Sequence, residues 1–410
     1  MRRVFLCLIA SLSAALFLGG CGGNGGTGSA GDEPLPEAEW TIMVYMAGDS
    51  DISQAALYNI NDMERIGSTD QVNIVVQVEF STEFSPSLPG NTLRGRISKD
   101  DDEKTIGSTF YDIGNLDMTD PDMLTDFITF SALKYPARHY AIILWSHGLG
   151  WKYASKGIIK DVTSAGEYSI MSIPEIANAL KASGLKFDLI DFDACLMGMY
   201  EVAYELRGLS EFISFSEALF PVYGNPYDII LNELTTYPDI AGQDLAHIIT
   251  SSCAGYYKSL GWSFTKSTIR ATEIEKVYAG VNDLANVLYN NMDTEGIHIR
   301  TAVGNTIEYY SYIYRDLGDF IDQLRTQTQN QDLLNSAISL DAVLKDLVVE
   351  SFSYSPEAND PITRSHGLSI YLPSPGLNIS RDIQRYSALS CNQGDQIEWV
   401  DFITRMDAEY

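Results

Sequence analysis

Positive charge is scarce in this sequence. Its 410 residues include 27 lysines and arginines against 55 aspartates and glutamates, which gives a formal net charge of −28. Removal of residues 1–20, which contain Arg2 and Arg3 and no acidic residue, would leave −28 − 2 = −30. Nucleic acids and anionic surfaces attract basic proteins, so this balance argues against either as a direct partner. The same balance mildly favours basic substrates.

Long apolar runs and cysteines are also few. After residue 20 no stretch reaches the roughly 18 apolar residues of a membrane-spanning helix. Two of the five cysteines belong to the first 21 residues, which leaves Cys195, Cys253 and Cys391. An odd number fits one free reactive thiol plus a Cys253–Cys391 disulfide, and three unpaired cysteines are the alternative.

The start of the chain has the composition of a bacterial lipoprotein signal peptide. Two arginines precede an apolar stretch, and small residues then lead to Cys21. We therefore predict a signal peptide at 1–20 and lipidation of Cys21; a plain signal peptide cleaved nearby is the alternative. The lipid would be the only membrane contact and would place the protein in the cell envelope, at the outer membrane or cell surface.

The next stretch, 21–39, is rich in glycine with some proline and acidic residues, and predicts a flexible tether. We expect the folded part at 40–410, with a C-terminal extension from about 240. That length suits one large α/β domain with such an extension.

Apolar, β-rich segments alternate with amphipathic ones over most of 40–410. This alternation predicts an α/β fold with a mostly parallel sheet covered by helices on both faces. The expected strands are 41–48, 73–79, 140–147, 187–192, 213–217 and 366–373. The expected helices are 54–66, 121–133, 173–183, 244–260, 271–292, 309–324, 332–349 and 397–406. Asp49 and Asp51 come just before the first helix, where acidic residues favour a helix start.

One stretch, 186–201, combines a buried strand, a turn and a helix start around Cys195. Ligands of open α/β sheets bind at the carboxyl ends of strands. A nearby helix N-terminus would lower the pKa of the thiol. Taken alone, a cysteine such as Cys195 is more often a buried core residue.

A second apolar, β-rich segment has the same pattern: it is an expected strand that ends at His147 and is followed by Gly148. It lies 195 − 147 = 48 residues before Cys195, which leaves room for one crossover, so the two strands can be parallel neighbours. A lone strand-end histidine is usually structural, but the pairing makes His147 the candidate base for Cys195. The dipeptide recurs at His366, where the histidine begins the expected strand instead of ending one. We therefore expect His366 at the opposite sheet edge if its strand is parallel.

The two motifs, HYAIILWSHGLGW and FDLIDFDACLMGMYEVAYEL, together resemble the clostripain family of cysteine peptidases. The likeness extends to WTIMVYMAGDSDISQAAL, VNIVVQVE, SEALFPVYGNPYD and HGLSIYLP, and so covers most of 40–410. It implies a caspase-like three-layer sandwich and an endopeptidase with a His147–Cys195 dyad. It also implies an oxyanion hole made by the backbone N–H groups of Gly148 and Cys195.

The resemblance further implies that Asp193 lines a pocket for a substrate arginine or lysine; a buried acid bonded to backbone amides is the alternative. Relatives often have a second acid in the loop after Ser216-Glu217, where this chain has Val222 and Tyr223. Specificity could therefore be shifted or relaxed.

Two more expectations follow from relatives. Some are cut in the segment after the histidine, which here is 152–161, and self-processing would follow Lys156 or Lys160. An intact surface loop is the alternative. Some relatives use calcium, but the sequence shows no metal-ligand spacing, and the charged run 99–104 predicts a solvated turn. No cofactor is required for the chemistry.

Two competing functions remain open at this point. One is a catalytically silent, clostripain-like binding lipoprotein, and the other is a nutrient- or glycan-binding surface lipoprotein. The presence of both His147 and Cys195 speaks against the first, and the second leaves the paired motif unexplained.

Overall fold

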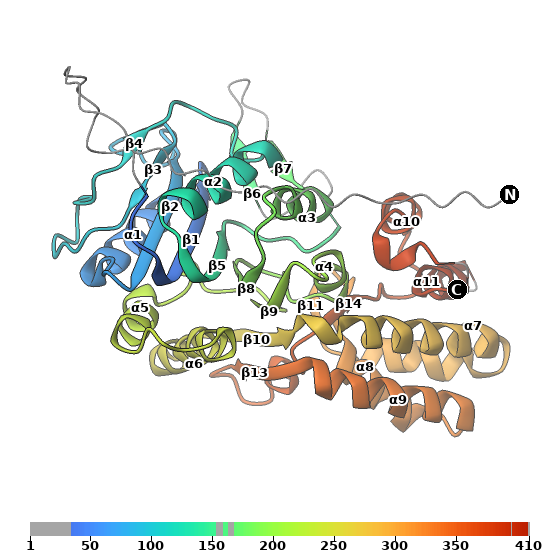
Figure 1. The fold of residues 1–410 in the computed structure, drawn as a ribbon. Coiled ribbons are helices and arrows are strands. Elements are labelled where there is room, and N and C mark those ends of the chain that lie inside the picture. Colours follow the sequence, from blue (N-terminus) through green and yellow to red (C-terminus); the bar gives the residue numbers. More distant parts are fainter. Residues whose placement is uncertain (1–33, 153–158, 163–167, 395, 409–410) are drawn as a thin grey trace, which may run out of the picture. The chain divides into compact units, whose positions relative to one another are not determined.

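A mostly parallel β-sheet forms the centre of the folded unit (Figure 1). The computed structural model describes residues 34–152, 159–162, 168–394 and 396–408. Nine strands of this described part form the sheet, in the order β13-β10-β9-β8-β5-β1-β2-β3-β4. They are β1 (Ala38–Gly48), β2 (Val72–Phe80), β3 (Leu93–Arg96), β4 (Tyr111–Asp112), β5 (Ala137–Trp145), β8 (Phe187–Asp193), β9 (Ser210–Phe215), β10 (Phe264–Arg270) and β13 (Val348–Tyr354). Strands β9, β8, β5, β1 and β2 are parallel, and the strands beyond them on both edges are antiparallel.

The apolar composition of the central strands explains their position. Every residue of β2 is buried, and so are the last nine residues of β1. Successive side chains of a strand point to opposite faces. Met43 and Tyr45 therefore enter the core on one face, while Ile42 and Val44 enter the core on the other. A sheet that is apolar on both faces has to be covered by helices on both sides.

Helices supply that cover. One face packs against α1 (Ser53–Ile66), α5 (Tyr227–Thr236) and α6 (Gly242–Leu260). The other packs against α2 (Pro121–Lys134), α3 (Ile173–Ala182), α4 (Tyr200–Glu205) and α7 (Ile274–Asn305). The predicted three-layer α/β arrangement is confirmed. Within the described ranges no helix is long and apolar enough to cross a membrane.

The C-terminal part adds helices and a small sheet. Helices α8 (Leu317–Gln327) and α9 (Gln331–Leu347) pack beside α7, and α10 (Ser380–Tyr386) and α11 (Trp399–Ala408) follow. A three-stranded sheet contains β11 (Glu308–Tyr310), β12 (Tyr314–Asp316) and β14 (Ser369–Tyr371). Strands β10 and β13 of this part extend the large sheet itself.

Three sequence expectations are corrected here. The predicted helix at 309–324 is a hairpin followed by α8, because Ser311 and Tyr312 take positive φ angles that end any helix. The late strand is reduced to β14, which pairs antiparallel with β12 in the small sheet. The expected loop at 152–161 ends in β6 (Ile159–Val162), which forms a hairpin with β7 (Tyr168–Met171).

Candidate active site

The two catalytic candidates follow neighbouring strands. Strands β5 and β8 are parallel, and their last residues, Trp145 and Asp193, are directly paired in the sheet. His147 and Cys195 each come two residues later, so the fold brings them to the same sheet edge. Both line one cavity of about 140 Å³. The predicted neighbourhood of the two residues is therefore present.

The turns after the two strands are in contact. A Cβ added to Gly148 would lie 2.0 Å from the carbonyl oxygen of Cys195 and 2.9 Å from its nitrogen, which only glycine permits. This approach places the backbone of Gly148 beside that of Cys195, next to the cavity. Leu196 then takes a φ of 62°, an uncommon conformation for a leucine, which turns the chain sharply after the cysteine.

Sequence reasoning missed a partner of the histidine. The Nε2 atom of His147 lies 2.7 Å from Oδ1 of Asp51. Asp51 follows β1, the strand on the other side of β5, and does not cap α1, whose N-cap is Ile52. This role of Asp51 could have been predicted from its position, because it is an acidic residue at the carboxyl end of the strand next to the His147 strand. Its assignment as a helix-start residue is corrected.

The thiol of Cys195 is half-buried. Its Sγ lies 3.2 Å from the backbone nitrogen of Phe220, which donates to it, and 3.6 Å from the carbonyl oxygen of the same residue. Burial raises the pKa of the thiol, the Phe220 N–H opposes this, and the Asp193 carboxylate adds to it. The prediction that a helix N-terminus lowers the pKa of this thiol is wrong, because α4 begins only at Tyr200, five residues after the cysteine. The free thiol therefore needs a base to form the thiolate.

The acid at the base of the cavity is Asp193. Its side chain is 4% exposed, and its Oδ2 accepts hydrogen bonds from the backbone N–H of Asn225 (2.9 Å) and the hydroxyl of Tyr227 (2.8 Å). Its Oδ1 has no hydrogen-bond partner among the described residues. Burial, opposed by the positive charge of Lys266, raises the pKa of Asp193 to about 6. Asp193 thus lines the cavity and also accepts from a backbone amide, and its role toward a substrate arginine or lysine stays a prediction.

A buried ion pair supports this acid from below. The ammonium of Lys266 on β10 lies 2.8 Å from Oδ1 of Asp191 on β8, and both side chains are fully buried. The other oxygen of Asp191 accepts from the side-chain amide of Asn225 at 2.6 Å. Cys253 donates to the amide oxygen of Asn225 at 3.2 Å. We did not predict this network, because β10 has the sequence FTKSTIR, in which only Phe264 and Ile269 are apolar, and that pattern does not mark Lys266 as buried.

Other expected residues lie elsewhere. Cys253 and Cys391 are both unpaired and buried in separate apolar clusters, so of the two alternatives left open by the sequence the structure has the unpaired cysteines. His366 binds Asp316 (Nδ1 to Oδ1, 2.9 Å) beside the small sheet and does not line the cavity. Cys21 and Lys156 lie outside the described residues.

Two further expectations concern processing and metals. The backbone of Lys160 belongs to β6 and pairs with Ile170, which corrects its placement in a loop. In the described part of the chain, no group of three or more His, Cys, Asp or Glu side chains is arranged to hold a metal ion.

Comparisons with known proteins agree with this geometry. The sequence profile of the clostripain family matches residues 44–405. Clostripain of Hathewaya histolytica is 24% identical over 413 residues, covering 82% of this chain and 74% of that protein. A secreted C11 cysteine protease from Bacteroides thetaiotaomicron, solved with an irreversible peptide inhibitor, shares 21% identity with a TM-score of 0.65, covering 89% of this chain and 99% of that one. An inactive zymogen C11 protease from Parabacteroides distasonis also has 21% identity and a TM-score of 0.65, covering 87% and 97%.

Proposed function

Because the chain belongs to the clostripain family and is a cysteine peptidase, we propose that it is an endopeptidase with a His147–Cys195 dyad. We also propose that it cleaves after lysine or arginine and acts while tethered to the cell envelope. The observation that carries this proposal is the shared cavity: both dyad residues line it, and Asp193 is the acidic residue in its lining.

The reaction begins with proton transfer. Since burial raises the pKa of the Cys195 thiol, His147 takes its proton as the substrate binds, and the sulfur attacks the peptide carbonyl. His147 then protonates the leaving amine, and in the second half it activates a water that releases the product. With Asp51 accepting from Nε2–H, the imidazole presents Nδ1 to the reacting groups, and Asp51 acts as a positioning residue.

The negative charge that develops on the tetrahedral intermediate has to be stabilised by hydrogen-bond donors. We assign the oxyanion hole to the backbone N–H groups of Gly148 and Cys195, which belong to two chain segments in contact beside the cavity. A glycine at 148 is required for that approach, because any Cβ would collide with the Cys195 carbonyl.

The substrate residue before the cleaved bond places its side chain in the cavity. A buried carboxylate with one unpartnered oxygen favours a cationic side chain, because an ion pair relieves the cost of burying the charge. No other acidic residue lines this cavity in the described part of the chain. Protein or peptide substrates with basic residues are therefore the proposed partners.

Two further parts of the proposal concern the lipid anchor and self-processing. A lipid on Cys21 would anchor the protein, with 21–39 as its tether. Self-cleavage after Lys156 or Lys160 would give one chain with His147 and another with Cys195, held together because β5 and β8 are paired. Denaturing gels of wild type and Cys195→Ala test this: new N-termini at 157 or 161 should appear only in wild type. An intact and fully active wild-type chain would end the processing idea.

The central test uses three variants on a library of peptides that differ at the residue before the cleaved bond. We expect Cys195→Ala and His147→Ala to abolish cleavage with unchanged circular dichroism. His366→Ala is the matched control, because that histidine is bonded to an aspartate outside the cavity. Full activity of Cys195→Ala would contradict the assignment, and cleavage by wild type after acidic or apolar residues would contradict the specificity.

A further inference from the structure

The two oxygens of the Asp193 carboxylate are in different situations. Oδ2 already accepts two hydrogen bonds, from the backbone of Asn225 and the hydroxyl of Tyr227. Gly224 closes over both oxygens, since a Cβ there would lie 2.6 Å from Oδ2 and 2.8 Å from Oδ1. Oδ1 alone lacks a partner among the described residues. Oδ1 is itself buried, and it is the carboxylate oxygen that still has hydrogen-bonding capacity for a ligand that enters the cavity.

Lysine and arginine differ in what they need from such a site. A guanidinium binds best to both oxygens of a carboxylate at once, through two parallel N–H···O bonds. An ammonium is a compact point charge and can bind a single oxygen with full strength. The rest of the cavity lining has one hydroxyl, that of Ser146, and no second carboxylate among the described residues. The geometry suits the ammonium.

The number of donors acts in the same direction. A guanidinium has five N–H donors, more than one carboxylate oxygen can accept. Its surplus N–H groups would be buried without acceptors, which is costly.

We propose that the cavity selects lysine over arginine at the residue before the cleaved bond. This inference rests on the proposed function, because it refines the specificity of the same site. The observation behind it is the different hydrogen bonding of the two oxygens of Asp193: Oδ2 accepts two hydrogen bonds from the protein, and Oδ1 has none among the described residues.

The experiment uses two fluorogenic peptides that differ only in having lysine or arginine at this position. The full chain should show a kcat/KM for the lysine peptide on the order of tenfold higher, the factor that one lost charge-assisted hydrogen bond represents. Equal or better cleavage of the arginine peptide would overturn the inference and leave the proposed function intact. Cleavage of neither peptide would overturn both.

A designed variant tests the cause of the preference. Val222 also lines the cavity, so Val222→Asp adds a second carboxylate there. It should raise the arginine-to-lysine ratio of kcat/KM, because the guanidinium then gains a second acceptor. Val349→Asp makes the same substitution at a partly exposed valine on β13, outside the cavity, and should leave the ratio as in wild type. An unchanged ratio in Val222→Asp would refute the single-oxygen explanation.

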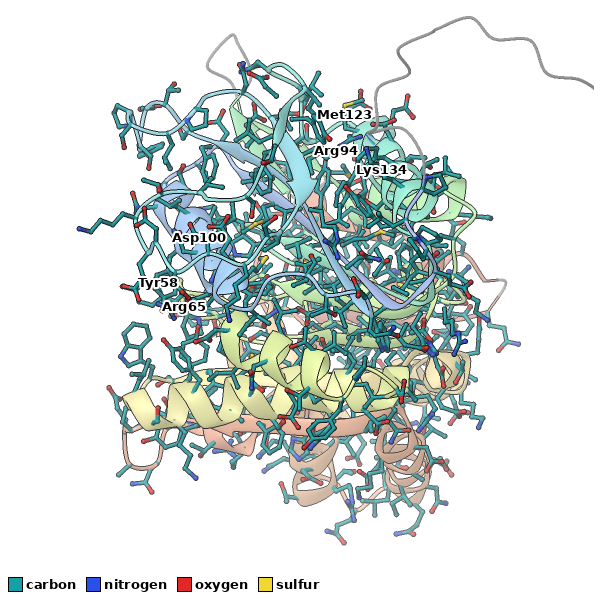
Figure 2. All side chains as sticks on the ribbon, turned by 60° about the vertical axis from the view of Figure 1, so that its left-hand side comes forward. Tyr58, Arg65, Arg94, Asp100, Met123 and Lys134 are labelled. Carbon is teal, nitrogen blue, oxygen red and sulfur yellow. The ribbon has the colours of Figure 1, made fainter. Side chains whose placement is uncertain are left out.

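A second, independent observation concerns the surface next to the cavity. Tyr223 and Trp262 are 40% and 39% exposed and stack on each other with ring centroids 5.7 Å apart. Tyr58 of α1, labelled in Figure 2 near Arg65 of the same helix, packs on Tyr223 at 5.1 Å. Val222, 53% exposed, connects these rings to the cavity that it lines. We call Tyr58, Val222, Tyr223 and Trp262 the aromatic ledge.

The ledge is held in place from below. The amide of Asn59 donates to the carbonyl oxygen of Tyr223 at 2.8 Å and accepts from the indole N–H of Trp145, a cavity residue. Tyr257 stacks under Trp262 and its hydroxyl donates to the carbonyl oxygen of Gly224. Exposed apolar rings on a rigid base usually mark a binding surface.

The geometry points to the substrate itself as the occupant of the ledge. A peptide with one side chain in the cavity must lay its neighbouring residues across the cavity rim, and Val222 makes the ledge continuous with that rim. The ledge would take an apolar or aromatic side chain within three residues of the cleaved bond. This assignment also rests on the proposed function but is independent of the lysine preference.

The test compares peptides with leucine or alanine at each of those neighbouring positions. At one position wild type should prefer leucine by about fivefold in kcat/KM, the value expected for partial burial of such a side chain. Trp262→Ala and Tyr223→Ala should each remove this preference, whereas Tyr237→Ala, an exposed tyrosine after α5, should keep it. A preference unchanged in both ledge variants, or none at any position in wild type, would overturn the assignment. Cleavage of no peptide would overturn the proposed function as well.

Discussion

Substitution of Lys266 by methionine should be among the most damaging single changes in the molecule. Both members of the Lys266–Asp191 pair are fully buried, and the ammonium also donates to the carbonyl oxygen of Phe192 at 3.3 Å. Methionine has similar bulk, so little packing is lost. The Asp191 carboxylate, however, would remain in the core with Ser214 and Asn225 as its hydrogen-bond partners in the described part of the chain. Breaking a buried pair from one side typically costs about 3–5 kcal/mol.

The assay is urea denaturation of wild type, Lys266→Met and the double variant Lys266→Met/Asp191→Leu. We expect the single variant to lose about 3–5 kcal/mol, a large part of the roughly 5–15 kcal/mol that stabilises a typical domain. The double variant should recover part of this loss, because no unpaired charge remains in the core. A loss below about 1 kcal/mol in the single variant, with an unchanged denaturant slope, would refute the reasoning.

Three further predictions concern the active site. Gly148→Ala should reduce kcat by at least about a hundredfold, the effect of losing an oxyanion donor, because its Cβ would collide with the carbonyl of Cys195; near-normal turnover would contradict this. Asp51→Asn should lower kcat by about tenfold with little change in KM, because Asp51 orients the imidazole and does not bind substrate. Asp49→Asn serves as the control. A change in KM alone would argue against the positioning role of Asp51. Because burial raises the pKa of Asp193 to about 6, kcat/KM for a lysine peptide should fall as the pH drops below about 6 and the carboxylate is protonated. The same raised pKa means that wild type loses stability relative to Asp193→Asn as the pH rises from about 4 to 6, which urea titrations at several pH values can measure.

Local sequence patterns were sufficient for the central strands and for placing His147 and Cys195 at the same sheet edge. Apolar runs that end in a polar residue and glycine identify strand ends, and parallel neighbours place those ends at one sheet edge. This is why His147 and Cys195 could be predicted to meet although they are 48 residues apart, and why Asp193 could be placed beside them. Their positions depend on periodicity within single segments plus one topological rule, whereas their chemical roles were implied by the resemblance to the clostripain family.

What the tertiary structure decided involves contacts between segments that no local pattern links. Asp51 reaches His147 across 96 residues, and Lys266 reaches Asp191 across 75, because strand order in the sheet sets them side by side. The same holds for Oδ1 of Asp193, whose lack of a partner among the described residues depends on how the segment 224–227 closes over the carboxylate. A sequence shows which residues are polar, but only the folded chain determines which of them are buried together and which hydrogen-bonding atoms are left for a substrate.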